Sequence, residues 1–394
     1  MNKRRLLIIN QSFCVGGIQS SMVNMANELS CDYDVDLFLY NPVGTMKERL
    51  NENVRVLDST WRFESLAMSW SEVIKTKDVK KMAFRFFATV WTKLVSNELP
   101  IQLAIKHQPM LEGYDLAISY RQEQHRKITT SGFCRVADQC VQAKRKVAWL
   151  HFDSDTIDLD SKYNNPFYHK MDKIVCVSRS LMTNFLRKHA DFSGKVDYCY
   201  NIVPYDDIKS KSLLQQEVAY PENKFICFSA CRLAEEKALV RAIHAISAVL
   251  KEHKDVVWYI AGDGPERQNI EEAIKENSLE EHVRLIGVQN NPYPYMRKAN
   301  LVLNVSYHEA APMVFFESKA LGTPVFATRT SSAEELLCDQ VDSFICENSE
   351  EGIRSAFARL MENRELVARA KTALQNCKTG NEESLRKIQE LFGE

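Results

Sequence analysis

The sequence predicts an α/β protein with two domains, each built on a parallel sheet covered by helices on both faces. Three observations lead to this prediction. Short apolar runs typical of strands alternate with amphipathic helical stretches along the chain. The length of 394 residues exceeds what one hydrophobic core ordinarily organises. A hydrophobic content of 45% and a charged content of 26% are typical of a folded globular protein.

The first domain is predicted to span residues 1–203. Its apolar runs have the length of buried strands and fall at residues 6–10, 34–40, 54–57, 114–120, 145–151 and 173–178. Gly16 and Gly17 lie between the first strand and a helix predicted over residues 19–29. Because glycine lacks a side chain, a ligand can approach the backbone closely there, although a tight turn explains the pair about as well.

The second domain is predicted to span residues 204–381. It begins with a polar stretch, residues 206–223, which we interpret as a linker. Strands are predicted at residues 224–229, 256–261, 283–286, 301–305, 325–327 and 343–346. From residue 350 onward the chain is charged and helical.

Composition and charge exclude several classes of protein. A net charge of −1 gives no overall attraction to nucleic acid, so we predict no nucleic-acid partner. None of the eleven cysteines forms a Cys-x-x-Cys pair, which favours buried free thiols in a reducing cytoplasm over disulfides or zinc. No apolar run approaches the ~20 residues of a membrane span, and the N-terminal run is too short for a signal sequence.

Residues 72–94 form the most unusual segment. Val79, Met82, Ala83, Phe86, Phe87, Val90, Trp91 and Leu94 follow helical spacing and predict one apolar stripe. Six basic and two acidic residues give the segment a net charge of +4. This combination predicts peripheral contact with an anionic membrane. The alternative is a surface helix whose stripe packs on the sheet of the first domain.

Two glutamates mark the strongest candidate site. Glu309 follows the strand predicted at residues 301–305, and Glu317 falls in the first turns of the next predicted helix. Open parallel sheets bind ligands at the carboxyl ends of their strands, and a helix N-terminus there offers N–H groups to an anion. The spacing of the two acids alone is common. The preceding strand, Pro312 and the Gly-Thr-Pro-Val strand start at residues 322–325 make a ligand site the better interpretation.

Further candidates follow other predicted strands. Arg232 and Lys237 follow residues 224–229, where fixed cations would stabilise the negative charge of a departing phosphate. Gly264 lies in a Gly-Asp-Gly-Pro turn that lacks the third glycine of a dinucleotide fingerprint. His151 ends the strand at residues 145–151, and Asp153 and Asp155 are predicted to hold its ring or to bind a substrate.

Residues 306–328 resemble the donor-site motif of the retaining, GT-B-fold glycosyltransferases of family four, and the resemblance continues at variable strength through most of the chain. It implies two Rossmann-like domains facing each other across a cleft, with residues 382–394 crossing back onto the first domain. It also implies a nucleotide-diphosphate sugar as donor, with UDP favoured, and a glycan or lipid-linked acceptor in cell-surface polysaccharide synthesis. The expected location is the cytoplasm, peripherally on the inner face of the membrane.

The resemblance also implies roles for individual residues. The expected catalytic residues are His151, Arg232, Lys237 and Glu309. The expected donor-binding residues are Gly16, Gly17, Gly264, Arg284, Ala311, Pro312, Met313, Val314 and Glu317. No cofactor beyond the donor and no metal are expected, since no Asp-x-Asp pair ends a strand of the second domain.

The chain departs from the family pattern at three positions, where Cys231, Ala238 and Ala310 replace glycines. These departures keep open a catalytically inactive subunit that binds a glycan or a partner. A sugar-nucleotide epimerase of the related two-domain fold is a further alternative, and the acidic motif and cationic loop match the transferases better. The incomplete glycine fingerprint disfavours an NAD dehydrogenase.

Overall fold

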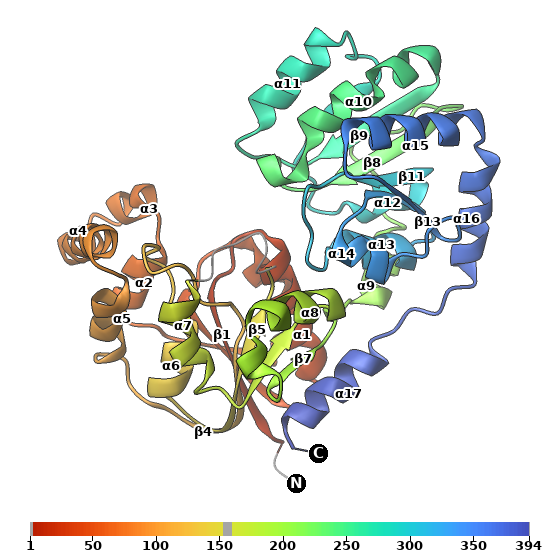
Figure 1. Cartoon of the computed structure of the whole chain (residues 1–394). Helices are drawn as coiled ribbons and strands as arrows, with labels where there is room; N and C mark the ends of the chain where they lie inside the picture. Colours follow the sequence, from red (N-terminus) through yellow and green to blue (C-terminus); the bar gives the residue numbers. More distant parts are fainter. Residues whose placement is uncertain (1–2, 153–159, 394) are drawn as a thin grey trace. The chain divides into compact units, whose positions relative to one another are not determined.

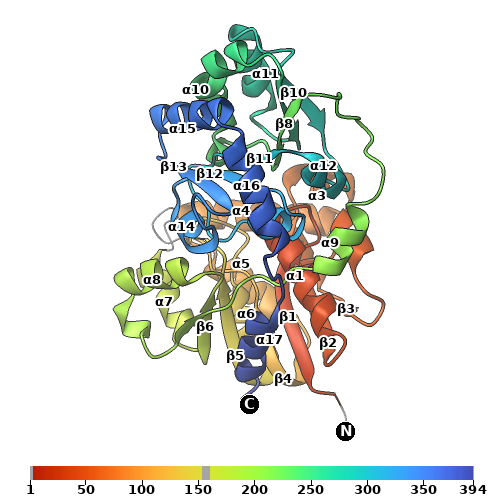
Figure 2. The same ribbon diagram turned by 90° about the vertical axis from the view of Figure 1, so that its right-hand side faces the viewer.

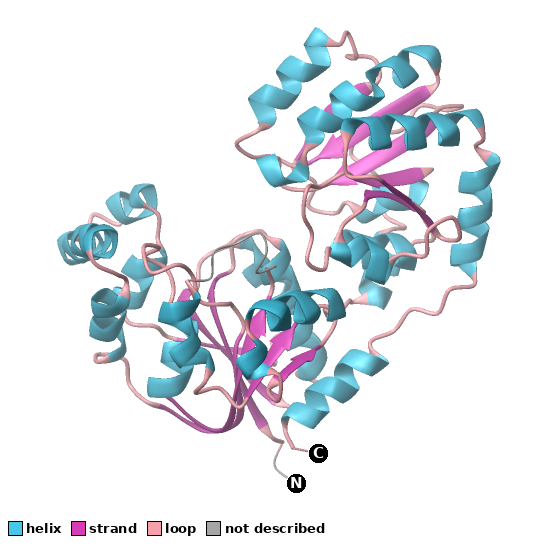
Figure 3. Ribbon diagram, in the orientation of Figure 1, coloured by secondary structure: helices cyan, strands magenta, loops and turns pink. Residues whose placement is uncertain are grey.

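The computed structural model describes residues 3–152 and 160–393, and the predicted roles of Asp153 and Asp155 lie outside these ranges. The chain divides into two compact units (Figure 1). Unit 1 contains residues Met1–Ile202 and Asn381–Glu394, and unit 2 contains Val203–Gly380. Each unit contains one parallel sheet with helices around it (Figure 3), so the predicted α/β fold with two parallel sheets is confirmed.

The sheet of unit 1 has seven strands in the order β3-β2-β1-β4-β5-β6-β7, and all adjacent pairs are parallel. The strands are β1 (Arg5–Ser12), β2 (Asp34–Asn41), β3 (Arg55–Leu57), β4 (Leu111–Ser119), β5 (Val141–Leu150), β6 (Lys173–Cys176) and β7 (Val196–Tyr198). Strands covered on both faces need continuous apolar runs, and residues 6–9 of β1 are accordingly fully buried. The chain order reverses between β1 and β4.

The helices of unit 1 are α1 (Gly17–Leu29), α2 (Trp61–Ala67), α3 (Trp70–Lys75), α4 (Val79–Leu94), α5 (Glu98–Ile105), α6 (Phe133–Gln139), α7 (Ser161–Tyr168), α8 (Arg179–Lys188) and α17 (Glu382–Leu391), with short 3-10 turns η1 (Thr45–Arg49) and η2 (Ala190–Phe192). Helix α17 lies against the rest of unit 1 in both views (Figures 1 and 2). Lys387 Nζ pairs with Asp197 Oδ1 at 2.8 Å, and the rings of Tyr33 and Phe392 stack with centroids 4.5 Å apart.

The apolar stripe predicted over residues 79–94 lies on α4, but it is on the face opposite to the one that packs against the neighbouring helices. Helix α4 packs on α2, α3 and α5 through its less apolar face, where Ala88 and Thr92 are fully buried. On the same face Lys81 pairs with Glu64, and Arg85 Nη1 donates to the carbonyl of Leu66 at 2.8 Å. The stripe therefore does not pack on the sheet: Val79, Phe86, Val90 and Leu94 are exposed by 73%, 63%, 40% and 76%.

The sheet of unit 2 has six parallel strands in the order β10-β9-β8-β11-β12-β13, and the chain order reverses between β8 and β11. The strands are β8 (Phe225–Ala230), β9 (Val256–Ala261), β10 (Val283–Gly287), β11 (Leu301–Asn304), β12 (Val325–Thr328) and β13 (Ser343–Cys346). The helices are α9 (Tyr205–Lys211), α10 (Leu239–Glu252), α11 (Arg267–Glu276), α12 (Tyr293–Lys298), α13 (Met313–Ala320), α14 (Ser331–Leu336), α15 (Glu350–Glu362) and α16 (Glu365–Gln375), with the 3-10 turn η3 (Glu235–Lys237).

Alternate residues of the central strands pack into the two apolar cores of unit 2. Cys227 and Trp258 belong to the core beneath α10, α11, α15 and α16, whereas Phe228 and Tyr259 belong to the core beneath α9, α12 and α13. This period of two is the pattern of a sheet buried on both faces.

One local prediction of secondary structure was wrong, and one strand was missed. The polar stretch at residues 206–223 begins within helix α9 rather than as a pure linker, and β7 was not predicted. All eleven cysteines are free thiols. The predicted burial holds for Cys134, Cys140, Cys176, Cys199, Cys227 and Cys346, but it is wrong for Cys14, Cys31, Cys338 and Cys377, which are exposed. Within the described residues no helix has the length and apolar character needed to cross a membrane.

Candidate active site

The candidate site lies in unit 2, where the order of the strands along the chain reverses between β8 and β11. Ligands of open parallel sheets bind outside the carboxyl ends of the strands at such a point. The loop after β8 carries Arg232 and then Lys237, which ends η3. The loop after β11 carries Glu309 and leads into α13. The fold therefore brings two segments about 70 residues apart to one sheet edge.

Lys237 and Glu309 form the central contact of this site. The Nζ atom of Lys237 donates to Glu309 Oε1 at 2.7 Å, and the two side chains are 22% and 10% exposed. Burial alone would lower the pKa of Lys237, but the charge and the hydrogen bond of Glu309 outweigh it and raise the pKa above its ordinary value. Lys237 is therefore a fixed positive charge at neutral pH, held in place before any ligand arrives.

Sequence reasoning missed the two residues that fix Glu309. Ser306 Oγ donates to Glu309 Oε1 at 2.7 Å, and Asn304 Nδ2 donates to the same oxygen at 3.2 Å. All these hydrogen bonds, including that of Lys237, end on Oε1. The only sequence signal was the position of Asn304 and Ser306 at the end of the strand that precedes Glu309.

Arg232 lies on the same edge with its side chain in solvent. Its side chain is 65% exposed, and Nη2 donates to Glu236 Oε1 at 2.6 Å. The neighbouring backbone is fixed, because Leu233 N donates to the carbonyl of Asp263 at 3.0 Å. The guanidinium is thus mobile enough to exchange an exposed carboxylate partner for a ligand anion, since exposed ion pairs contribute only about 0–1 kcal/mol.

Gly264 and Gly262 shape the turn against which the Arg232 loop packs. Both have positive φ, 159° and 144°. A Cβ on Gly264 would lie 2.2 Å from the carbonyl oxygen of Leu233, and one on Gly262 would lie 1.9 Å from that of Cys231. Gly264 therefore helps to position the loop that carries Arg232.

Ala238 occupies a backbone conformation that glycine would adopt more easily. Its φ of 51° and ψ of 30° are left-handed, directly before α10. An L-residue with a Cβ is strained there by roughly 1–2 kcal/mol. We expect Ala238→Gly to stabilise unit 2 by about 0.5–1 kcal/mol after the entropy cost of glycine in the unfolded chain. Chemical denaturation measures this difference.

Ala310→Gly is the matched control, because Ala310 also replaces a family glycine but is not among the described residues with positive φ. It should give no gain in stability. Equal effects of the two substitutions would contradict the strain assigned to Ala238.

Glu317 lies in the second turn of α13, the helix that follows the Glu309 loop. The hydroxyl of Tyr293 donates to Glu317 Oε1 at 3.4 Å. Pro312 caps α13, so the N–H groups of Met313 and Val314 open the helix, and Ala311 lies just before it. The first N–H groups of a helix have no carbonyl partner within it. This end of α13 therefore provides hydrogen-bond donors on the segment between Glu309 and Glu317.

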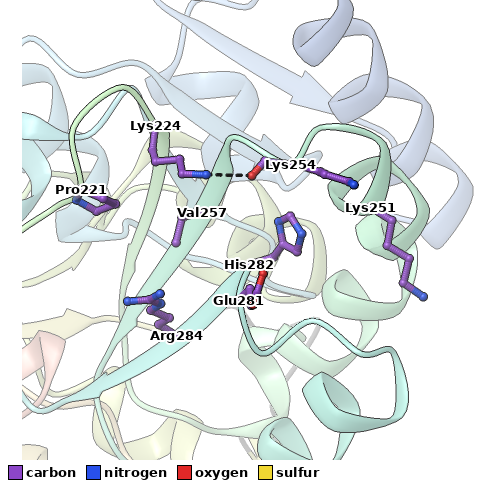
Figure 4. A pocket seen from close by; sticks show the side chains of 8 residues that line it. All are labelled: Pro221, Lys224, Lys251, Lys254, Val257, Glu281, His282 and Arg284. Carbon is purple, nitrogen blue, oxygen red and sulfur yellow. Dashed lines mark hydrogen bonds between the residues drawn. The ribbon is translucent and has the colours of Figure 1, made fainter.

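Arg284 does not join this group. It lines a pocket at the opposite edge of the unit 2 sheet, where the strands begin (Figure 4). The pocket is lined by Pro221, Lys224, Lys251, Lys254, Val257, Glu281, His282 and Arg284. The fold thus separates the Arg284 side chain from Lys237 and Glu309 by the length of the strands.

In unit 1, Gly16, Gly17 and His151 follow β1 and β5 at the carboxyl edge of the sheet. Gly16 has extended backbone, and a Cβ there would meet only the Gln19 side chain, while a Cβ on Gly17 would meet nothing within 4 Å. His151 is 8% exposed, and burial and then the charge of Arg121 lower its pKa to about 3. The imidazole is therefore neutral at physiological pH. No cluster suited to a metal ion occurs in the part of the chain that the structure describes.

Comparisons with known proteins agree with this arrangement. Residues 210–376 match the family described as glycosyl transferases group 1. Over 173 residues the chain is 31% identical to the N-acetylgalactosamine-N,N'-diacetylbacillosaminyl-diphospho-undecaprenol 4-alpha-N-acetylgalactosaminyltransferase of Campylobacter jejuni, covering 44% of this chain and 46% of that protein. Over 144 residues it is 26% identical to the lipopolysaccharide core biosynthesis glycosyltransferase LpsD of Rhizobium meliloti, covering 36% and 41%. The chain spans about half the length of the curated relatives it matches.

Solved structures resemble the whole chain. HepE of Anabaena in complex with UDP has a TM-score of 0.67 at 17% identity, covering 99% of each chain. TarM of S. aureus, in a complex that contains UDP, has a TM-score of 0.66 at 14% identity and covers 100% of each. This likeness shows the fold, which is that of the GT-B glycosyltransferases. The family match over residues 210–376 lies within unit 2 and agrees with the family resemblance of residues 306–328.

Proposed function

We propose that this protein is a retaining glycosyltransferase that moves a sugar, a hexose or an N-acetylhexosamine, from a nucleotide-diphosphate donor to a glycan or lipid-linked acceptor in cell-surface polysaccharide synthesis. The observation that carries the proposal is the Lys237–Glu309 contact at the switch point of the unit 2 sheet. A half-buried, charged lysine beside a carboxylate that is already held in place suits a ligand that combines phosphate with sugar hydroxyls. UDP is the favoured nucleotide, because it is bound in solved relatives of this fold.

Each part of the site has a role in this reaction. Lys237 and Arg232 receive the negative charge of the leaving diphosphate, and fixed charges of this kind lower the barrier without reorganising. The N–H groups at the start of α13 hold phosphate or sugar oxygens. Glu317 accepts hydrogen bonds from the ribose hydroxyls, and the remaining oxygen of Glu309, Oε2, accepts one from the transferred sugar. Two protein cations take the charge-neutralising role, so we propose that the reaction proceeds without a metal ion.

A thermal-shift screen of UDP, GDP and ADP sugars tests the proposal. Specific binding raises the melting temperature by mass action. We expect a rise with the sugars of one nucleotide, UDP, and activity that persists in excess EDTA. No rise with any nucleotide sugar would instead favour the inactive binding subunit.

We also propose that the protein acts in the cytoplasm and docks on an anionic membrane through the outward face of α3 and α4. Exposed apolar side chains gather there, among them Trp70, Ile74, Phe86 and Leu94. Exposed lysines surround them at positions 75, 77, 80 and 93. A polar rim around an apolar face matches the boundary between acyl chains and acidic headgroups. An acceptor carried by a lipid would then be presented at the membrane surface.

A further inference from the structure

A second group of polar side chains lies in unit 1, at the point where the order of the strands along the chain reverses. Arg121 and Gln122 directly follow β4, which is adjacent to β1 at the reversal of chain order. His151 follows the next strand, β5. This is the position in the unit 1 sheet that corresponds to the Lys237–Glu309 position in unit 2, and parallel sheets bind ligands there.

Arg121 is a partly buried cation that no carboxylate among the described residues neutralises. Its Nε atom is buried and has no hydrogen-bond partner, and no carboxylate pairs with its guanidinium among the residues described. Burial lowers the pKa of Arg121, and no acidic neighbour counters this effect. The nearby Glu123 is already engaged by Gly132 N and Cys134 N at 2.7 and 2.8 Å. A buried charge without a partner is costly, so a ligand of opposite charge would stabilise it.

Gln122 adds a hydrogen-bond donor whose direction is fixed. Its Oε1 accepts from the backbone N–H groups of His151 at 3.0 Å and Phe152 at 2.9 Å. These two donors leave only one orientation of the amide, with the NH₂ group away from them. The residue is 1% exposed, and the Nε2 atom is buried with no partner in the described part of the chain.

His151 completes the group as a neutral ring. Its imidazole packs edge-on against Tyr120 with centroids 4.7 Å apart. Its Nε2 atom is also buried and has no partner among the described residues. The charge of Arg121 reaches this ring, since it contributes to lowering the pKa of His151. The charge of Arg121 thus acts on the imidazole, and the Gln122 side chain lies against the backbone of the same histidine. Among the described residues no carboxylate pairs with Arg121.

We propose that Arg121 and Gln122 form an anion-binding site in unit 1, which holds a phosphate or carboxylate group of the acceptor. The assignment of the bound group to an acceptor rests on the proposed glycosyl transfer. The binding of an anion by Arg121 and Gln122 does not depend on it. Arg121 provides the charge, Gln122 donates to a second anion oxygen, and the neutral His151 accepts a hydrogen bond from a hydroxyl beside the anion. The donor diphosphate already has Lys237 and Arg232 in unit 2. An acceptor bearing phosphate, such as a lipid-linked or phosphorylated glycan, is therefore the substrate class that fits.

The test uses the full chain with isotope-labelled histidine, and it follows the His151 imidazole signal, assigned with His151→Gln. Inorganic phosphate and acetate are the probes, and UDP is added in a separate arm. In the wild type, phosphate or acetate should shift the His151 signal and raise the pKa of the ring, because a bound anion offsets the charge of Arg121. Arg121→Gln should weaken this response about tenfold or more. Arg121→Lys should retain part of it, and Arg145→Gln, an exposed arginine on β5, should retain all of it.

The melting temperature separates this role from a structural one. Removing a partly buried cation that has no carboxylate partner among the described residues should leave the melting temperature of Arg121→Gln unchanged or higher, whereas loss of a structural arginine would lower it. Anion titrations that are the same in the wild type and Arg121→Gln would overturn the site, as would a wild type that does not respond. A His151 response to UDP that disappears in Arg121→Gln would assign the anion to the nucleotide instead of the acceptor. Because phosphate binding here needs no sugar transfer, failure of this test and failure of the proposed function are distinguishable.

Discussion

Lys237→Met is expected to lower kcat for sugar transfer, or for slow hydrolysis of the donor, by roughly 10²–10³-fold. The substitution keeps most of the side-chain length and removes the charge that would face the leaving diphosphate. Glu309 would retain the hydrogen bonds of Asn304 and Ser306, so its position should change little. The measurement is the initial rate of UDP release from the donor identified in the thermal-shift screen.

Lys224→Met is the control for this prediction. Lys224 lies at the opposite edge of the same sheet, where its Nζ atom donates to the carbonyl of Lys254 at 3.0 Å. Its loss should leave the rate within twofold of the wild type. Removing Lys237 also leaves Glu309 as a charge that is only 10% exposed, so a modest loss of stability is expected and is checked by the melting temperature. A folded Lys237→Met protein with the wild-type rate would remove Lys237 from the mechanism.

The double variant Phe86→Ser, Val90→Ser is expected to weaken binding to vesicles that contain anionic lipid by about 100-fold. Each apolar side chain that enters the membrane contributes roughly 1.5–3 kcal/mol, which is at least about tenfold in the partition constant. Both side chains are exposed, so the fold should not depend on them. Co-sedimentation with vesicles measures the loss, and added salt should weaken the wild type because the lysines contribute.

Leu213→Ser, Leu214→Ser is the matched control, since these residues of unit 2 are exposed by 70% and 58%. Their removal should not change vesicle binding. If Phe86→Ser, Val90→Ser bound vesicles as well as the wild type but lost self-association in sedimentation, the stripe would be a contact between two copies and the membrane proposal would be wrong.

The strands were predictable because parallel strands covered on both faces must be continuously apolar. Each predicted run from residues 6–10 to residues 343–346 corresponds to a strand of one of the two sheets. Strand β7 escaped because Val196, Asp197 and Tyr198 are only half-buried at the edge of the sheet and contain a charged residue. An edge strand of three residues leaves no apolar run to detect.

The orientation of α4 could not be derived from its periodicity. The spacing correctly indicated an apolar stripe, but the opposite face is the one that packs. That face is stabilised by partners distant in sequence, such as Glu64 for Lys81 and the Leu66 carbonyl for Arg85. Periodicity locates a stripe, whereas only the tertiary partners determine whether it faces the core.

The candidate site likewise has features that could be predicted from the sequence and features that could not. Glu309, Glu317, Arg232 and Lys237 follow apolar strands, so their position at a sheet edge could be inferred from the sequence. Their direct contacts could not, because the Lys237–Glu309 pair joins segments that are adjacent only in the folded sheet. Arg121 gave no sequence signal, because only the structure shows that it is partly buried and that no carboxylate among the described residues pairs with it.

Calorimetric titration of UDP into the wild type, Arg232→Ala and Glu317→Ala tests the central claim most directly, because it measures binding of the nucleotide apart from chemistry. The wild type should bind UDP with measurable heat. Each variant should bind at least about tenfold more weakly, since each loses a charge-assisted hydrogen bond to the ligand. UDP affinity that is equal in all three proteins, with no variant weakened, would contradict a nucleotide-sugar site at the carboxyl edge of the unit 2 sheet.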